Sequence, residues 1–271
     1  MSGTRAAVAT IARIPYLNAE PFYARWDDAP GTSVDLPPRA LGDAARNGQA
    51  DAGLMAAADW FTLDPEFERV GNFGISCRAA VDSVLLFSRR PIGDLTGATV
   101  DLTEHSQTSV ALTRILLSAR HGLTEVTYRR RALEAGEAPL GDAWLLIGDA
   151  AIRARRAHVR SAGADALHVL DLGKAWHAWT GLPFVYAVWA VRAALPREER
   201  ARLAAFLETS LAVGEKDLPG IGARYALAAP DLGTPAELAT YLAAFRYRLG
   251  PDEEKGLDRF RALWKEHCLD A

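Results

Sequence analysis

Residues 99–117, TVDLTEHSQTSVALTRILL, combine a strand, a polar turn and a helix in one continuous segment. The apolar side chains around Val100 predict a short buried strand. From Val110 to Leu116, apolar side chains recur at the spacing of one helix face. The residues between these two elements are polar, and several carry hydroxyl groups. The segment therefore predicts a strand that leads directly into a helix with a Ser- and Thr-rich first turn.

The start of this predicted helix consists of Ser106, Gln107, Thr108 and Ser109. The first turn of a helix presents backbone N–H groups without partners in the helix and the positive end of the helix dipole. Together with hydroxyl donors, these groups suit an anion. Ordinary N-capping accounts for the same residues, because Ser and Thr are favoured at helix starts whatever the function. The segment by itself leaves both interpretations open.

The composition is that of a globular protein, and the 271 residues suffice for one large domain or two ordinary ones. A net charge of −3 gives no sign of a nucleic-acid partner or of an anionic membrane surface. No uncharged apolar run reaches the length of a membrane span. The N-terminal residues lack a convincing signal-peptide core, so we expect a cytoplasmic protein.

Motifs for metals and phosphates are absent from the sequence. Cys77 and Cys268 are far apart and have no metal-binding spacing, which argues against both a disulfide framework and a zinc site. There is no GxGxxG, GxxxxGK[ST], GxSxG or HExxH motif. Of the histidines, only His105 lies in the polar turn described above. The basic runs 129–131 and 153–158 are expected on solvated faces.

Strands and helices alternate up to about residue 192, which predicts mostly parallel sheets with helices on both faces. The expected strands are Val8–Ile14, Val34, Ala52–Met55, Phe73–Ser76, Ser83–Phe87, Thr99–Asp101, a strand near Val126, Ala143–Ile147, Leu167–Leu170 and Phe184–Val191. Beyond Pro196 we expect only helices, at Arg197–Val213, Leu218–Leu227, Thr234–Leu249 and Asp252–Cys268. The third of these begins with a capping box, Thr234 to Glu237.

The alternating segment divides into two α/β units, with passages between them near residues 88–92 and 186–192. We therefore expect two lobes: residues 1–89 with 190–271, which include the C-terminal helices, and residues 90–189. In such an arrangement the ligand lies between the lobes, at strand ends and helix N-termini.

Neutral hydrogen-bonding residues gather in the loops expected at that interface. They are Tyr16, Asn18, Ser83, the run Ser106–Ser109, Gly148 and Asp149. Each loop alone is a weak signal. Backbone N–H and hydroxyl groups can hold a carboxylate without a paired charge, so together the loops predict a cleft for a small polar anion.

Five segments, in order, resemble the motifs of the chorismate dehydratase family, which opens the futalosine route to menaquinone. They are Arg13–Phe22 (RIPYLNAEPF), Ser83–Ser88 (SVLLFS), Thr108–Leu112 (TSVAL), Ile147–Ala151 (IGDAA) and Thr180–Val185 (TGLPFV). The resemblance covers residues 8 to about 192. It implies a type 2 periplasmic-binding-protein fold, with two α/β lobes around a cleft. It also implies that chorismate loses water to give 3-[(1-carboxyvinyl)oxy]benzoate, without a metal or an organic cofactor.

The resemblance also implies the residues of the site. Asn18 and Ser83 are expected to be catalytic, and the expected substrate-binding residues are Tyr16, Ser106, Gln107, Thr108, Ser109, Gly148 and Asp149. Gln107 departs from the family pattern, where Arg, Lys or a small polar residue is expected. The partner of one substrate carboxylate therefore stays open, with Arg39 as a candidate.

Aromatisation of the ring supplies driving force for this reaction, so the protein mainly has to orient the substrate and stabilise charge. The motif loops offer no obvious strong base. Our hypothesis is that one substrate carboxylate takes the proton, while Thr108, Ser109 and the helix N-terminus hold the ring carboxylate. Asn18 would orient the departing hydroxyl or the enolpyruvyl arm.

Two alternatives share the expected fold, and fold alone does not decide function. One is 1,4-dihydroxy-6-naphthoate synthase of the same pathway, although the segment Pro15–Asn18 favours the dehydratase. The other is a solute-binding protein that captures a small anion without chemistry. The sequence leaves the oligomeric state open.

Overall fold

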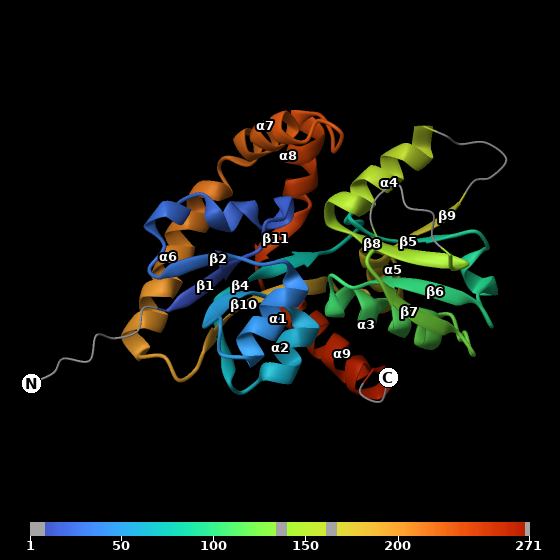
Figure 1. Cartoon of the computed structure of the whole chain (residues 1–271), viewed down its shortest axis with the longest axis horizontal. Coiled ribbons are helices and arrows are strands. Elements are labelled where there is room, and N and C mark those ends of the chain that lie inside the picture. The colour runs from blue at the N-terminus through green and yellow to red at the C-terminus, as the bar shows by residue number, and fades with distance from the viewer. Residues whose placement is uncertain (1–8, 134–139, 161–166, 269–271) are drawn as a thin grey trace, which may run out of the picture.

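Two β-sheets form the centres of two lobes that lie side by side (Figure 1). The computed structural model describes residues 9–133, 140–160 and 167–268. The first sheet has the order β11-β4-β10-β3-β1-β2, with strands β1 (Thr10–Arg13), β2 (Thr32–Asp35), β3 (Ala52–Ala56), β4 (Phe67–Cys77), β10 (Phe184–Arg192) and β11 (Phe245–Arg248). The second has the order β7-β6-β8-β5-β9, with strands β5 (Val84–Ser88), β6 (Thr99–Thr103), β7 (Thr127–Arg131), β8 (Ala143–Ile147) and β9 (His168–Asp171).

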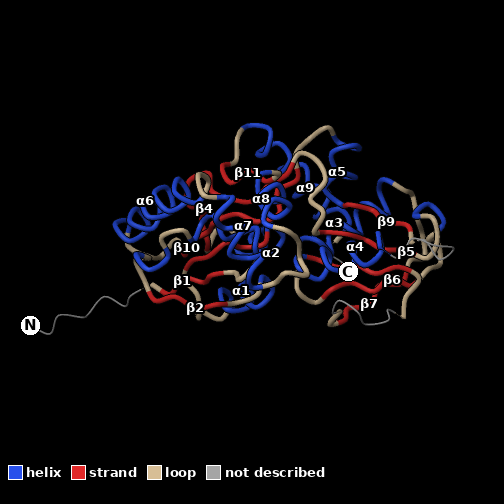
Figure 2. The backbone as a smooth tube through the Cα atoms, turned by 90° about the horizontal axis from the view of Figure 1, so that it is seen from above, coloured by secondary structure: helices blue, strands red, loops and turns tan. Residues whose placement is uncertain are grey.

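Helices surround both sheets, and the view from above shows them around the two groups of strands (Figure 2). The first lobe carries the 3-10 helix η1 (Leu17–Tyr23) and the helices α1 (Pro38–Arg46), α2 (Ala57–Leu63), α6 (Arg197–Gly214), α7 (Leu218–Ala228), α8 (Pro235–Ala243) and α9 (Pro251–His267). The second carries α3 (Gln107–Ile115), α4 (Gly148–Arg160) and α5 (Leu172–Thr180). Every residue of β3 and of β5 is buried, as expected for strands covered on both faces.

Both sheets are mixed, so the prediction of mostly parallel sheets was wrong. In the first sheet β1 runs parallel to β2 and β3, whereas β10 runs antiparallel to β3 and β4. In the second, β6 runs parallel to β7 and β8, whereas β5 runs antiparallel to β8 and β9. A crossover helix imposes the parallel direction only on strands that it joins within one sheet. Strands β5 and β10 each enter from the other lobe, which the alternating pattern does not reveal.

The passages between the sheets lie close to those expected, but their positions differ. The chain leaves the first sheet at the end of β4 and enters the second with β5, so it crosses between Cys77 and Val84. It returns after α5, and residues 184–192 belong to the first sheet. The expected boundaries at residues 89/90 and 189/190 therefore do not coincide with the crossings. The division into lobes at those two boundaries stays a prediction.

The expected helix Thr234–Leu249 is shorter than predicted, because α8 ends at Ala243 and β11 follows as an edge strand on β4. In β11, Phe245 and Tyr247 are buried while Arg246 is exposed, which is the alternation of a strand. The capping box at the start of α8 is confirmed: the backbone N–H of Glu237 donates to Thr234 at 3.3 Å, and the Glu237 carboxylate accepts from Thr234 N–H at 2.7 Å.

The C-terminal helix α9 links the two lobes (Figure 1). Phe260 of α9 packs against Phe184 of β10, with ring centroids 4.8 Å apart, and edge-on against Trp176 of α5 at 6.2 Å. All three rings are fully buried. Since Trp176 belongs to the second lobe, this aromatic cluster joins the two lobes.

Candidate functional site

A cavity lies between the lobes, and its wall contains most of the predicted site residues. Tyr16 and Asn18 come from the first lobe, Ser83 from the passage between the sheets, and Ser106, Thr108, Ser109 and Gly148 from helix starts of the second lobe. Gln107 and Asp149 do not line the cavity. Apolar side chains form the rest of the wall, together with Tyr186 and Phe245. The cavity volume is about 70 Å³, below the roughly 300 Å³ at which small-molecule sites begin.

A larger groove of about 700 Å³ lies between α4 and α8, next to this cavity. Its wall is mostly apolar, and both of its arginines are paired. Arg155 pairs with Asp82, and Arg156 pairs with Glu237 at 3.0 Å. We assign the site to the smaller cavity because the polar side chains converge there.

The start of α3 combines an N-cap with hydroxyl groups that line the cavity. Ser106 is the N-cap, and its hydroxyl accepts the Ser109 N–H at 3.1 Å. The same hydroxyl donates to Ser109 Oγ at 3.1 Å. A cap of this kind satisfies one N–H group, so the N–H groups of Gln107 and Thr108 keep no partner within the helix. Ser106, Thr108 and Ser109 line the cavity, so the helix start lies beside it, and backbone N–H groups at such a position suit a carboxylate.

Asn18 and Ser83 offer the free polar groups of the cavity. Within the described residues, the Asn18 amide makes no hydrogen bond to the protein. Ser83 is only 2% exposed, and its backbone carbonyl accepts the Gly148 N–H at 2.7 Å. Its hydroxyl accepts a hydrogen bond from Tyr241 of α8 at 2.9 Å. The Ser83 proton is therefore available to a ligand.

Gly148 begins α4 with a φ of +57°, a backbone conformation that favours glycine. A side chain there would also meet the ring of Tyr16, whose nearest carbon lies 3.6 Å from the position of a Cβ atom. Asp149 follows in the first turn of α4 and is half-buried beside the cavity. Burial raises its carboxyl pKa, with a smaller opposing effect of Arg153 and a further increase from Asp231.

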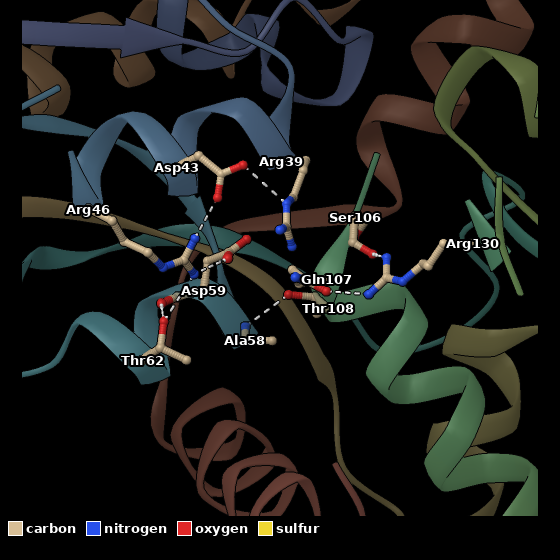
Figure 3. A network of polar contacts seen from close by, with 10 residues as sticks. All are labelled: Arg39, Asp43, Arg46, Ala58, Asp59, Thr62, Ser106, Gln107, Thr108 and Arg130. Atoms are coloured by element: carbon tan, nitrogen blue, oxygen red, sulfur yellow. Dashed lines mark hydrogen bonds and ion pairs between the residues drawn. The ribbon is translucent and has the colours of Figure 1, made fainter. Parts of the chain in front are cut away.

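Two arginines lie on either side of Gln107, one from each lobe (Figure 3). Arg130 of β7 donates to the Gln107 side chain and to the backbone carbonyl of Thr103, the latter at 3.1 Å. Arg39 of α1 pairs with Asp43 at 3.3 Å and points toward Gln107 from the other side. Burial lowers the pKa of Arg130, and the positive charge of Arg39 lowers it further. As a whole residue Arg130 is exposed, as expected for the basic run, but its guanidinium end is partly buried where it contacts the start of α3.

Several residues of the site were not found from the sequence. Tyr186, Phe245 and Pro38 line the cavity, and Tyr241 contacts Ser83 from a helix distant in sequence. Tyr186 lies in the TGLPFV region, whose resemblance could have drawn attention to it. Tyr241 carries no such signal, because its role depends on packing of α8 against the start of β5.

The remaining candidates lie outside the cavity. His105 is half-buried and does not line it. Burial raises the pKa of Cys77, which disfavours the thiolate. Among the described residues, no group of three or more His, Cys, Asp or Glu side chains is placed to hold a metal ion. No helix in the described part of the chain has the length and apolar character needed to cross a membrane.

Comparison with known proteins identifies the family and the fold of this chain. Residues 9–266 match the family model described as menaquinone biosynthesis. The chain is 32% identical over 226 residues to chorismate dehydratase of Thermus thermophilus, which covers 78% of this chain and 79% of the relative.

Two solved structures show the same fold. An Archaeoglobus fulgidus protein superposes with a TM-score of 0.77 at 14% identity, over 95% of this chain and 96% of the other. A Candida albicans protein with the generic periplasmic binding protein fold superposes with a TM-score of 0.63 at 7% identity, over 96% and 95%. The two-lobed periplasmic-binding-protein fold is thereby confirmed, and the chain belongs to the chorismate dehydratase family of menaquinone biosynthesis.

Proposed function

We propose that this protein is a chorismate dehydratase, which removes water from chorismate to give 3-[(1-carboxyvinyl)oxy]benzoate in menaquinone biosynthesis. Its relative of that name supports the activity. The observation in the structure that carries the proposal is the start of α3, where Thr108 and Ser109 line one cavity together with Asn18 and Ser83. This is a site for an organic anion, held by neutral donors.

The reaction breaks the C3–H and C4–O bonds of chorismate. The electron pair of the C3–H bond becomes part of the aromatic ring. The C4 hydroxyl departs with its bonding pair, and one proton, equal to the one lost from C3, completes the water molecule. Among the described residues that line the cavity, none is Asp, Glu, His, Lys or Arg. Burial raises the pKa of Tyr186 well above its usual range, so that it stays protonated. This supports a substrate carboxylate as the group that takes the C3 proton.

Each element of the site then has a separate task. The N-terminus of α3, with Thr108 and Ser109, holds the ring carboxylate while charge builds up in the ring. The free amide of Asn18 and the proton of Ser83 orient the departing hydroxyl or the enolpyruvyl arm. We infer that Arg39 and Arg130, on either side of Gln107, flank the mouth of the site, where their positive charge favours entry of a dianion. Asp149 contributes to the first turn of α4 without acting as the base.

The decisive experiment incubates the purified protein with chorismate and follows the ultraviolet absorbance of an aromatic product. Mass spectrometry should show that the product has lost one water. Asn18→Ala and Ser83→Ala should each lower kcat. If chorismate binds but remains unchanged, the protein is a solute-binding protein instead. If chorismate neither binds nor reacts, the sister enzyme 1,4-dihydroxy-6-naphthoate synthase becomes the candidate.

The proposal also covers the location and the partners of the enzyme. A biosynthetic relative supports a cytoplasmic location. The only partner that we propose is the small dicarboxylate substrate, and a net charge of −3 supports the absence of a nucleic-acid partner.

A further inference from the structure

Tyr241 is the one side chain of the C-terminal helices that reaches a proposed catalytic group by a hydrogen bond among the described residues. It lies on α8, yet its hydroxyl is 2.9 Å from Oγ of Ser83, 158 positions earlier in the chain. Its ring packs edge-on against Phe245, with centroids 5.1 Å apart. Phe245 in turn lines the cavity. Tyr241 therefore stands directly behind the cavity wall, between it and the groove lined by α4 and α8.

The direction of this hydrogen bond follows from the surroundings of the two hydroxyl groups. Each hydroxyl has one proton to donate and can also accept. Tyr241 has no other acceptor for its proton among the described residues, whereas Ser83 faces the cavity. If Ser83 donated to Tyr241, the buried phenol proton would have no partner, which is unfavourable. Tyr241 is therefore the donor, and the Ser83 proton is left to point toward the ligand.

The phenol keeps its proton throughout the working pH range. Burial raises the pKa of Tyr241 by more than the hydrogen bond with Ser83 lowers it. The negative charge of Asp149 raises this pKa further. The Tyr241 hydroxyl therefore remains a hydrogen-bond donor over this pH range, and it does not serve as a base.

We propose that Tyr241 is a positioning residue, whose hydroxyl fixes the Ser83 proton in the direction of the substrate. The proposal rests on the role assigned to Ser83 in the proposed function. Without the phenol, the Ser83 hydroxyl can turn away or donate elsewhere, and it reaches the reactive geometry less often. Tyr241 does not contact the substrate in this proposal; it acts through Ser83.

Tyr241→Phe in the full-length protein tests this proposal, because it keeps the ring and removes only the hydroxyl. We expect kcat to fall about tenfold, the size of effect typical of one lost hydrogen bond, with KM changed less than about twofold. The matched control is Tyr247→Phe. Tyr247 is also buried, belongs to the same aromatic cluster, and donates to the Leu242 carbonyl at 3.3 Å. The control loses a comparable hydroxyl away from the cavity and should keep its kcat.

A double-mutant cycle separates positioning from a structural role. In a Ser83→Ala background, Tyr241→Phe should cause no further loss of kcat, because the residue through which it acts is gone. An equal loss in both backgrounds would overturn the proposal, as would a normal kcat in Tyr241→Phe alone. Thermal unfolding of each variant verifies that it is folded.

The same measurements distinguish this inference from the proposed function. A wild-type protein that does not convert chorismate overturns the proposed function and the inference with it. If the wild-type protein converts chorismate and the Tyr241→Phe variant does so equally well, only the inference is overturned.

Discussion

The hydroxyl of Thr108, in the first turn of α3, accepts a hydrogen bond of 2.9 Å from the backbone N–H of Ala58 at the start of α2. The two residues belong to different lobes, and Thr108 is 1% exposed. This bond uses an acceptor position of Thr108 and leaves its proton for a ligand. The same side chain therefore joins the two lobes, and in the proposed function it also binds the anion.

Replacing Thr108 tests this double role. Thr108→Val keeps the volume but removes the acceptor and leaves a buried N–H group unpaired, so we expect the closed form to be less populated. KM for chorismate should rise about tenfold, whereas Thr108→Ser, which keeps the hydroxyl, should stay close to the wild type. Steady-state kinetics give the comparison. Similar KM values for the Val and Ser variants would contradict the link between lobe closure and this bond.

The cap of α3 should affect both stability and binding. Ser106→Ala removes the acceptor of the Ser109 N–H group and should lower the free energy of unfolding by about 1 kcal/mol. Since the cap also orders the anion-binding turn, KM should rise as well. Thr234→Ala is the control: it removes the equivalent cap of α8 and should cost a similar free energy without changing KM. Denaturant unfolding gives the free energy of unfolding of both variants, and steady-state kinetics give their KM. An equal rise of KM in both variants would show that binding depends only on overall stability.

The arginines at the mouth should act through long-range charge. Arg39→Gln and Arg130→Gln should each lower kcat/KM severalfold at low salt and weaken its decrease with added salt, because fewer charges attract the dianion. Arg25→Gln removes an exposed arginine that pairs with Asp28, and it should change neither quantity. Rates measured over a range of ionic strength provide the test. An unchanged salt dependence in both mouth variants would exclude this role.

Asp149 should influence stability in a defined pH window without being required for turnover. Burial raises its pKa in the folded protein above the ordinary value of 3.8. The folded state therefore binds the proton more tightly than the unfolded state, so stability falls as pH rises from about 3.8 to the raised pKa and is constant above it. Asp149→Asn should remove this pH dependence and keep or increase the stability at neutral pH.

The same variant, together with His105→Ala, tests the substrate-assisted mechanism. Neither side chain lines the cavity, so both variants should retain most of the kcat of the wild type. Unfolding curves between pH 3 and pH 8 and turnover assays at pH 7 measure the two effects. Loss of turnover in a variant that still binds chorismate and folds would assign the proton transfer to the protein.

Interactions between residues close in the chain were predicted well. The Ser- and Thr-rich first turn of α3 and the capping box of α8 are confirmed, because each depends on hydrogen bonds over three positions. The donor-rich loops were also found, since each follows a strand or begins a helix. Strand β11 was missed, because its alternation covers only four residues directly after a helix.

The sequence by itself determined the α/β class, the anion-binding turn and, through resemblance, the family, because short hydrogen bonds and residue types set these features locally. The tertiary structure alone decided the mixed direction of the sheets, since strand direction depends on which lobe each strand enters. It also decided the contacts of Tyr241 with Ser83 and of Arg130 with Gln107. Such contacts join residues far apart in the chain, and only the packing of both lobes brings them together.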